Sequence, residues 1–160
     1  LAGNPNAGKT TIFNVLTGLH QHTGNWPGKT VEKKEGEIQH GNLKINIVDL
    51  PGTYSLTAYS PEEIIARDFI IQEHPDVVIN VVDATNLERN LYLTVQILEL
   101  DVPLVIALNM ADDLHKNGAK INLDQLSQLL GNIPFVSTTA NQGKGISDLI
   151  SKAVRAAGRN

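Results

Sequence analysis

The sequence has no cysteine, few aromatic residues and no excess of basic charge. With Cys 0, disulfide bonds and thiolate metal sites are excluded, and the composition fits a reducing compartment. Lys+Arg 13 against Asp+Glu 17 gives a formal net charge of -4, which disfavours a general nucleic-acid binder because such proteins carry a basic surface. No charged-then-apolar leader is present and no apolar run reaches the roughly 18 residues of a membrane helix, so we expect that this chain alone does not cross a membrane.

Length and composition fit one globular domain over residues 1–160. Hydrophobic residues make up 41% of the sequence and charged residues 19%, which is ordinary for a domain that buries a real core. A Gly-rich stretch begins at Gly3, and a loop of this kind needs a buried strand before it. We therefore expect that the first strand is truncated and that the sequence is a fragment of a longer polypeptide.

Residues 3–11 match the phosphate-binding loop (P-loop) pattern of Gly, four residues, Gly, Lys and then Ser or Thr. Gly3 and Gly8 allow the backbone to curl until successive N–H groups face one anion, and Lys9 neutralises phosphate charge. The hydroxyl of Thr10 is a hard oxygen ligand suited to Mg²⁺, and a helix that begins there directs its positive end at the phosphates. The predicted contacts to the phosphates are Asn4, Asn6, Ala7, Gly8, Lys9, Thr10 and Thr11.

Hydrophobic periodicity predicts an α/β fold in which strands and helices alternate. We expect helices over residues 11–16, 60–73, 87–98, 122–131 and 146–154, and strands over residues 31–39, 43–48, 77–82, 104–108 and 133–136. With the truncated first strand, these elements predict a mostly parallel six-stranded sheet with one antiparallel edge strand and helices on both faces. Residues 19–30 lack periodicity and are predicted to form a long loop.

Polar or Gly-rich segments follow the predicted strands, and in such sheets ligands bind beyond the carboxyl ends of the strands. These segments are residues 3–10, 49–52, 109–112 and 137–139. Asp49 can hold Mg²⁺ through a water, and the backbone N–H of Gly52 can approach a terminal phosphate and order the segment that follows. The sequence therefore predicts one nucleotide site with a phosphate-dependent switch.

The segment Asn109-Met110-Ala111-Asp112 predicts which base is bound. A carboxylate accepts two hydrogen bonds from the ring N–H and exocyclic amine of guanine, whereas adenine presents a lone pair there and lacks that amine. A site whose polar groups would stay unpaired can reject the wrong partner by a factor on the order of 10⁴. Guanine is therefore favoured. The spacing between Asn109 and Asp112 makes Asp112 the predicted carboxylate, and Asp113 is the rival assignment.

Together, the motifs at residues 3–10, 49–52 and 109–112 resemble those of translation-factor-class GTPases, which have a Ras-like P-loop fold. Residues 24–36 and 83–93 narrow the match, because they resemble the cytosolic G domain of the FeoB family of prokaryotic ferrous-iron transporters. The resemblance covers essentially the whole chain. It implies a G domain at the cytoplasmic face of the inner membrane, in a polypeptide whose helical regulatory and membrane domains are not in this chain.

The resemblance implies binding of GTP and GDP with Mg²⁺ and slow, K⁺-stimulated GTP hydrolysis in a switch module that controls ferrous-iron transport. The implied partners are guanine nucleotide and the membrane domain of the same polypeptide, with no nucleic acid; a homo-oligomer stays open. A soluble Era-like GTPase of ribosome or RNA assembly is the alternative, which the net charge of -4 and the lack of a basic tail disfavour. A nucleotide sensor whose hydrolysis is incidental is a third interpretation.

Metal ligands also follow from the resemblance. Thr30 is the implied switch threonine that binds Mg²⁺ and the terminal phosphate. Asn6 matches an asparagine that coordinates K⁺ in potassium-activated relatives, with backbone carbonyls near Gly24 and Trp26 completing the cage. The Trp26 side chain is either a mobile aromatic of the switch loop or a packing anchor. The implied catalytic residues are Asn6, Lys9, Thr30 and Gly52.

The loops of the site are assigned in the same way. The implied first switch spans residues 19–30, and the second spans residues 49 to about 60. The implied guanine loop is Ser137, Thr138 and Thr139, with the backbone N–H of Thr138 or Thr139 meeting the guanine oxygen.

The residues expected to speed hydrolysis are missing. Thr53 stands where Ras-like enzymes carry a water-orienting Gln, and no arginine finger can be assigned, so the implied turnover is slow. Arg67 and Arg89 are candidate fingers, but structural or solvated helix positions are the favoured interpretation. His20 and His22 lie two residues apart without a third ligand, which disfavours an iron site.

Overall fold

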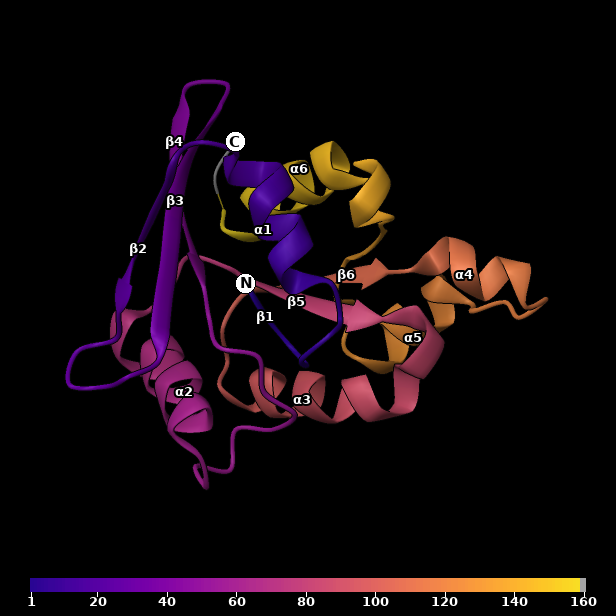
Figure 1. The fold of residues 1–160 in the computed structure, drawn as a ribbon. Coiled ribbons are helices and arrows are strands. Elements are labelled where there is room, and N and C mark those ends of the chain that lie inside the picture. Colours follow the sequence, from indigo (N-terminus) through magenta and orange to yellow (C-terminus); the bar gives the residue numbers. More distant parts are fainter. Residues whose placement is uncertain (159–160) are drawn as a thin grey trace.

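The computed structural model describes residues 1–158, and a parallel sheet lies at its centre (Figure 1). Across this sheet the order is β1 (Ala2–Gly3), β5 (Val78–Asp83), β6 (Leu104–Asn109) and β7 (Phe135–Ser137). An antiparallel sheet has the order β2 (Gln21–Asn25), β3 (Glu32–His40) and β4 (Leu43–Asp49). β5 and β6 consist mainly of buried apolar residues, as expected of parallel strands that are covered on both faces.

Backbone hydrogen bonds join the two sheets through Leu1. The amino group of Leu1 donates to the Val48 carbonyl at 2.7 Å, and the N–H of Leu50 donates to the Leu1 carbonyl at 3.0 Å. Leu1 thus bonds to Val48 and Leu50, the two neighbours of Asp49, and this is the hydrogen-bond pattern of two parallel strands. The end of β4 therefore lies beside β1, and the segment after β4 is carried to the loop after β1.

Helices cover both faces of the sheet (Figure 1). They are α1 (Lys9–Thr17), α2 (Pro61–Glu73), α3 (Leu87–Glu99), α4 (Ala111–Lys116), α5 (Leu123–Leu129) and α6 (Ile146–Ala156), with short 3₁₀ helices η1 (Ala84–Asn86) and η2 (Ala140–Gln142). α1 and α6 share a core that contains Ile12 and Leu149, while α2 and α3 share the opposite core through Ile70 and Leu93. Among the described helices, none has the length and apolar character needed to cross a membrane.

The α/β class, the mostly parallel sheet and the helices on both faces are confirmed. The loop expected over residues 19–30 needs a correction, because β2 forms within it and pairs antiparallel with β3, placing Gln21 opposite Gly36. Four of the five residues of β2 are exposed, so no apolar alternation marks this strand in the sequence. Pairing with β3, rather than side-chain burial, makes β2 a strand. β2 is therefore an edge strand in place of β3, and the strands form a parallel sheet of four and an antiparallel sheet of three where one sheet of six was expected.

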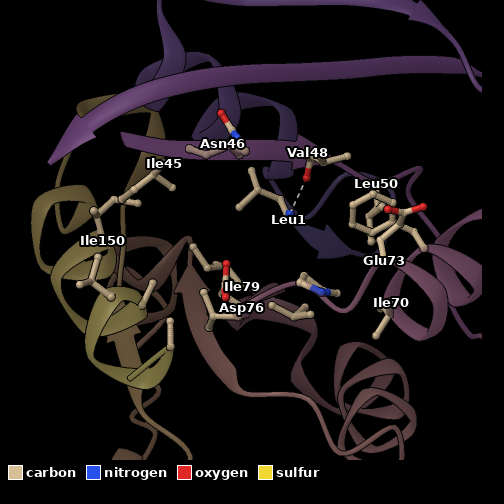
Figure 2. Close-up of a pocket in the computed structure, with 18 of the residues that line it drawn as sticks. Leu1, Ile45, Asn46, Val48, Leu50, Ile70, Glu73, Asp76, Ile79 and Ile150 are labelled. Carbon is tan, nitrogen blue, oxygen red and sulfur yellow. Dashed lines mark hydrogen bonds between the residues drawn. The ribbon is translucent and has the colours of Figure 1, made fainter. Parts of the chain in front are cut away.

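A groove of about 570 Å³ lies between β4, the start of β5, α2 and α6, as Figure 2 shows. Its walls are mainly apolar and include Ile45, Ile70, Ile79 and Ile150. Leu1 lines this groove, where its amino group bonds to β4. Within residues 1–158, β4 and β5 thus form two sides of the groove.

Candidate nucleotide-binding site

The P-loop leads from β1 into α1 through two left-handed residues. The Ala7 N–H donates to the Asn4 carbonyl at 3.2 Å, and the backbone φ is 69° at Asn6 and 94° at Gly8. A Cβ on Gly8 would collide with the side-chain nitrogen of Asn109, so this position requires glycine. No side chain caps the start of α1. The N–H groups of its first turn are therefore left for an anion.

Lys9 and Asp49 form a buried ion pair between α1 and the end of β4. The Nζ atom of Lys9 donates to Oδ1 of Asp49, and the two residues are only 8% and 6% exposed. Buried charges require partners of opposite sign, so each residue serves as the other's counter-ion in this structure. The exposed Thr10 follows Lys9 on α1. An ammonium group, a carboxylate and a hydroxyl are the donor set that a nucleotide phosphate with Mg²⁺ needs.

The second switch begins against the P-loop. A Cβ on Gly52 would lie 3.3 Å from Cα of Pro5, and the N–H of Thr53 donates to the Gly3 carbonyl at 3.1 Å. The structure thus places the flexible Gly52 backbone next to the loop that is expected to hold phosphate. Thr53 is buried and has no side-chain amide with which to orient a water.

Glu63 ties the rest of the second switch to α2. Its carboxylate accepts hydrogen bonds from the hydroxyls of Thr57 at 2.7 Å, Ser55 at 3.1 Å and Ser60 at 3.2 Å. These bonds, that of Thr57 above all, hold the pKa of Glu63 below its ordinary value. A lowered carboxyl pKa stabilises the fold above the pKa of the unfolded chain, and this contribution is lost as the pH falls through the folded pKa.

A second pocket, of about 310 Å³, lies at the carboxyl end of β6 and includes Gly8 of the P-loop. Asn109 joins three segments at its wall. Its Nδ2 donates to the Ala7 carbonyl at 3.0 Å, and its Oδ1 accepts from the Thr138 hydroxyl and the Ala140 N–H, each at 3.1 Å. One buried side chain therefore fixes the P-loop against the segment that follows β7.

Both candidate carboxylates lie at this pocket, together with Met110. Lys116 faces them from the last turn of α4, with its Nζ 3.9 Å from Asp112 and 3.4 Å from Asp113. The Asp112 side chain is 33% exposed and that of Asp113 is 54% exposed. Asp112 is therefore the carboxylate set deeper in the wall, although the geometry leaves both within the pocket.

The wall opposite Asp112 lies further along the chain than the predicted guanine loop. Of the three predicted residues, only Thr139 lines the pocket, because Ser137 ends β7 and Thr138 is buried with its hydroxyl on Asn109. The pair Thr139-Ala140, a hydroxyl residue followed by alanine, is the sequence signal that would have located this wall. The residues that the sequence analysis missed are Ala140, Asn141 and Gln142.

A family model described as "Ferrous iron transport protein B" matches residues 1–153. The chain belongs to this family. The family match covers the P-loop, the two predicted switch segments and the pocket at Asn109, so these features lie in one FeoB-type domain.

Individual relatives and solved structures agree with this family assignment. The Fe(2+) transport protein A/Fe(2+) transporter FeoB fusion protein of Porphyromonas gingivalis is 53% identical over 155 residues, which cover 96% of this chain and 18% of the relative. The cytosolic domain of the T. maritima FeoB iron transporter, solved in a GDP form, has a TM-score of 0.94 and 46% identity over 99% of this chain and 62% of that chain. For the FeoB G-domain of Methanococcus jannaschii, the TM-score is 0.86 and the identity 47%, over 98% of this chain and 94% of that chain. The chain spans about a fifth of the length of the curated FeoB relatives it matches.

The turn of the predicted first switch lies apart from the P-loop. Thr30 belongs to the connection between β2 and β3, which Figure 1 shows beside α2 and away from the start of α1. The Trp26 carbonyl, expected near K⁺, accepts a hydrogen bond from the Lys29 N–H at 2.9 Å. Gly24 lies in β2 opposite Lys33. The predicted site residues in this separate segment are Gly24, Trp26 and Thr30.

The two arginines weighed as fingers have other partners. The Arg89 guanidinium lies over the Tyr54 ring, 4.2 Å from its centroid, and Arg67 pairs with the neighbouring Asp68 at 3.2 Å. These contacts agree with structural roles. Within residues 1–158, no group of three His, Cys, Asp or Glu side chains could hold a metal ion, so His20 gains no set of further ligands.

Replacing Asn109 by Ala should loosen the P-loop from the segment that follows β7. The Ala7 carbonyl, the Thr138 hydroxyl and the Ala140 N–H would each lose a partner, and a buried unsatisfied group costs about 1–3 kcal/mol. We expect the free energy of unfolding in urea, measured without nucleotide, to fall by about 2–4 kcal/mol. The control is Asn141→Ala, the same change at an exposed position on the same wall, which should stay within about 0.5 kcal/mol. Equal losses in both variants would contradict the special role of Asn109.

Proposed function

We propose that this chain is the GTP-binding module of a ferrous-iron transporter, which binds GTP and GDP with Mg²⁺ and hydrolyses GTP slowly. The observation that carries the proposal is the convergence of the P-loop, the Lys9–Asp49 pair and the Asn109 pocket at the carboxyl ends of neighbouring strands. A relative solved in a GDP form supports guanine nucleotide as the ligand. The names of much longer relatives support a role in iron transport, with the membrane domain of the same polypeptide as partner and the cytoplasmic face of the membrane as location.

Phosphate binding would rearrange the buried ion pair. The free N–H groups at the start of α1 and the Lys9 ammonium meet the phosphate oxygens, and Lys9 then leaves Asp49. Thr10, Thr30 of the predicted first switch and, through a water, the freed Asp49 carboxylate are the residues that would hold Mg²⁺. Mg²⁺ bound there would neutralise charge on the phosphate oxygens. The same arrangement explains why a lysine and a carboxylate are buried together beneath the P-loop.

Hydrolysis is the in-line attack of water on the terminal phosphorus, and its catalysis consists mainly of positioning and charge stabilisation. We expect the Gly52 N–H to bond the terminal phosphate, whereas Thr53 supplies no amide to orient the water. Arg67 and Arg89 are engaged elsewhere. An arginine finger is worth about 10³–10⁵ in rate, or roughly 4–7 kcal/mol of barrier. Slow intrinsic turnover follows, and K⁺ held by Asn6 would supply part of the missing positive charge.

Asp112→Asn should exchange guanine for xanthine. The amide oxygen can still accept the ring N–H, but the amide nitrogen is a donor where the carboxylate accepted from the exocyclic amine of guanine. The variant therefore loses one hydrogen bond to guanine, sets two donors against each other, and complements the extra carbonyl of xanthine. We expect GDP affinity, measured by equilibrium dialysis, to fall about 10–100-fold and xanthosine diphosphate to become the better ligand. Asp113→Asn tests the rival carboxylate and should leave GDP affinity within about twofold. The opposite pattern would assign the base to Asp113.

GTP turnover in K⁺ and in Na⁺ tests the role of Asn6. If its side chain holds K⁺ beside the phosphates, turnover should be at least about tenfold faster in K⁺ than in Na⁺, since one well-placed charge stabiliser is worth at least that much. Asn6→Ala should lose this difference and keep GDP affinity, because the backbone N–H groups and Lys9 remain. Equal rates for both proteins in both salts would remove K⁺ from the mechanism.

We also propose that the groove of Figure 2 holds an extended segment that precedes Leu1 in the longer polypeptide. Val48 bonds toward Leu1, so Asn46, two residues earlier on β4, directs its backbone groups the same way. On β5, Val78 donates to Pro103 on the β6 side at 2.8 Å, so the next residue directs its groups toward the groove. Backbone groups of β4 and β5 thus face each other across an apolar channel.

Adding the residues that precede Leu1 in the gene should stabilise the chain. A strand there would pair with both strands and cover the apolar walls, which we expect to add at least about 2 kcal/mol and raise Tm by about 4–8 °C. The control adds the same number of Gly and Ser residues. If scanning calorimetry gives the same Tm for both extensions, the groove is not the place of this segment.

A further inference from the structure

Trp26, the single tryptophan of the sequence, anchors the first switch to α2. Its side chain is buried, whereas residues 22–25 and 27–30 on either side are exposed. The Phe69 ring of α2 meets the indole edge to face, with 5.8 Å between ring centroids and 79° between the ring planes. The Lys33 ammonium lies 4.8 Å from the indole centroid. Both are favourable geometries for an aromatic ring, so one side chain holds a stretch that is otherwise exposed.

Backbone hydrogen bonds make the turn after Trp26 move with the indole. The Trp26 N–H donates to the Val31 carbonyl, and the Lys29 N–H donates to the Trp26 carbonyl, both at 2.9 Å. Thr30 lies inside this closed turn, which Figure 1 shows beside α2. Docking of the indole therefore fixes Thr30 outside the phosphate site. In the same turn the Trp26 carbonyl, which is expected to face K⁺, accepts the Lys29 N–H.

An unsatisfied N–H group destabilises the docked position of the indole. Its Nε1 is buried without a hydrogen-bond partner among the described residues. A buried N–H without a partner costs free energy that an indole in contact with water does not pay. The aromatic contacts hold the indole against this cost, which brings the docked and released states closer in free energy.

We infer that Trp26 is a positioning residue that acts through Thr30. Docked on Phe69, its indole holds the first switch away from the phosphates. Thr30 reaches the Mg²⁺ site, and the Trp26 carbonyl becomes available to K⁺, only after the indole leaves α2. This inference rests on the proposed function, because GTP and the cations must favour the released state over the docked state.

Intrinsic fluorescence tests the inference directly, since Trp26 is the only tryptophan. With a non-hydrolysable GTP analogue, Mg²⁺ and K⁺, we expect the emission maximum to move to longer wavelength. Quenching by acrylamide should rise at least about twofold, because the released indole meets solvent. The nucleotide-free protein should keep the emission of a buried indole. Binding of the analogue is measured in parallel by calorimetry.

Phe69→Ala removes the docking partner without touching the phosphate site. We expect stronger quenching already in the nucleotide-free protein. The K⁺ concentration for half-maximal GTP turnover should fall about 3–10-fold, because a larger fraction of the protein is in the released state. Ile71→Ala is the control: it shortens a 46% exposed apolar side chain on the same helix and should change neither value. Circular dichroism verifies that both variants are folded.

The outcomes separate the two proposals. If the analogue binds and quenching does not change, Trp26 does not leave α2 and the inference is wrong, while nucleotide binding stands. If neither GDP nor the analogue binds, the proposed function fails and the inference fails with it. A Phe69→Ala protein with unaltered quenching would also refute docking on Phe69.

Discussion

The hydrogen bonds of Asn109 are the constraint on which the site depends. Its side chain reaches the P-loop carbonyl of Ala7, 102 residues earlier in the chain, and at the same time holds Thr138 and Ala140 after β7. This approach is possible only because Gly8 has no Cβ. The phosphate loop and the base pocket therefore share one wall, since Gly8 and Asn109 both line the pocket. A shift of either segment would change phosphate and base contacts together.

A second constraint is the burial of Lys9 with Asp49. Taking both charges out of water is costly, and the ion pair recovers that cost only in part. A ligand that offers an anion to the lysine and a cation to the carboxylate would satisfy both groups better than they satisfy each other. The burial of these two charges at the P-loop therefore favours a ligand that combines a phosphate with a divalent cation. Asp49 enters this arrangement because β4 lies beside β1 through the bonds at Leu1.

The sequence predicts those parts of the fold in which the type and spacing of the side chains are determined by the local structure. The apolar runs of β5 and β6 mark strands covered on both faces, and the glycines and lysine of the P-loop have few alternative explanations. The lining of the pocket after β7 was only partly predictable, because hydrogen bonds to Asn109, rather than any local pattern, decide that Thr138 lies behind the pocket while Thr139 and Ala140 line it. β2 escaped prediction because it is made by backbone pairing at an exposed edge.

The missing pattern in the first switch has a physical meaning. A segment with alternating apolar side chains would be bound firmly to one surface, and its register would resist change. Residues 22–30 instead bury one side chain, Trp26, and leave that side chain with an unsatisfied N–H. Such a segment can exchange a hairpin beside α2 for a position near the phosphates at the loss of a few contacts. The property that hid β2 from sequence analysis is therefore the property that a switch requires.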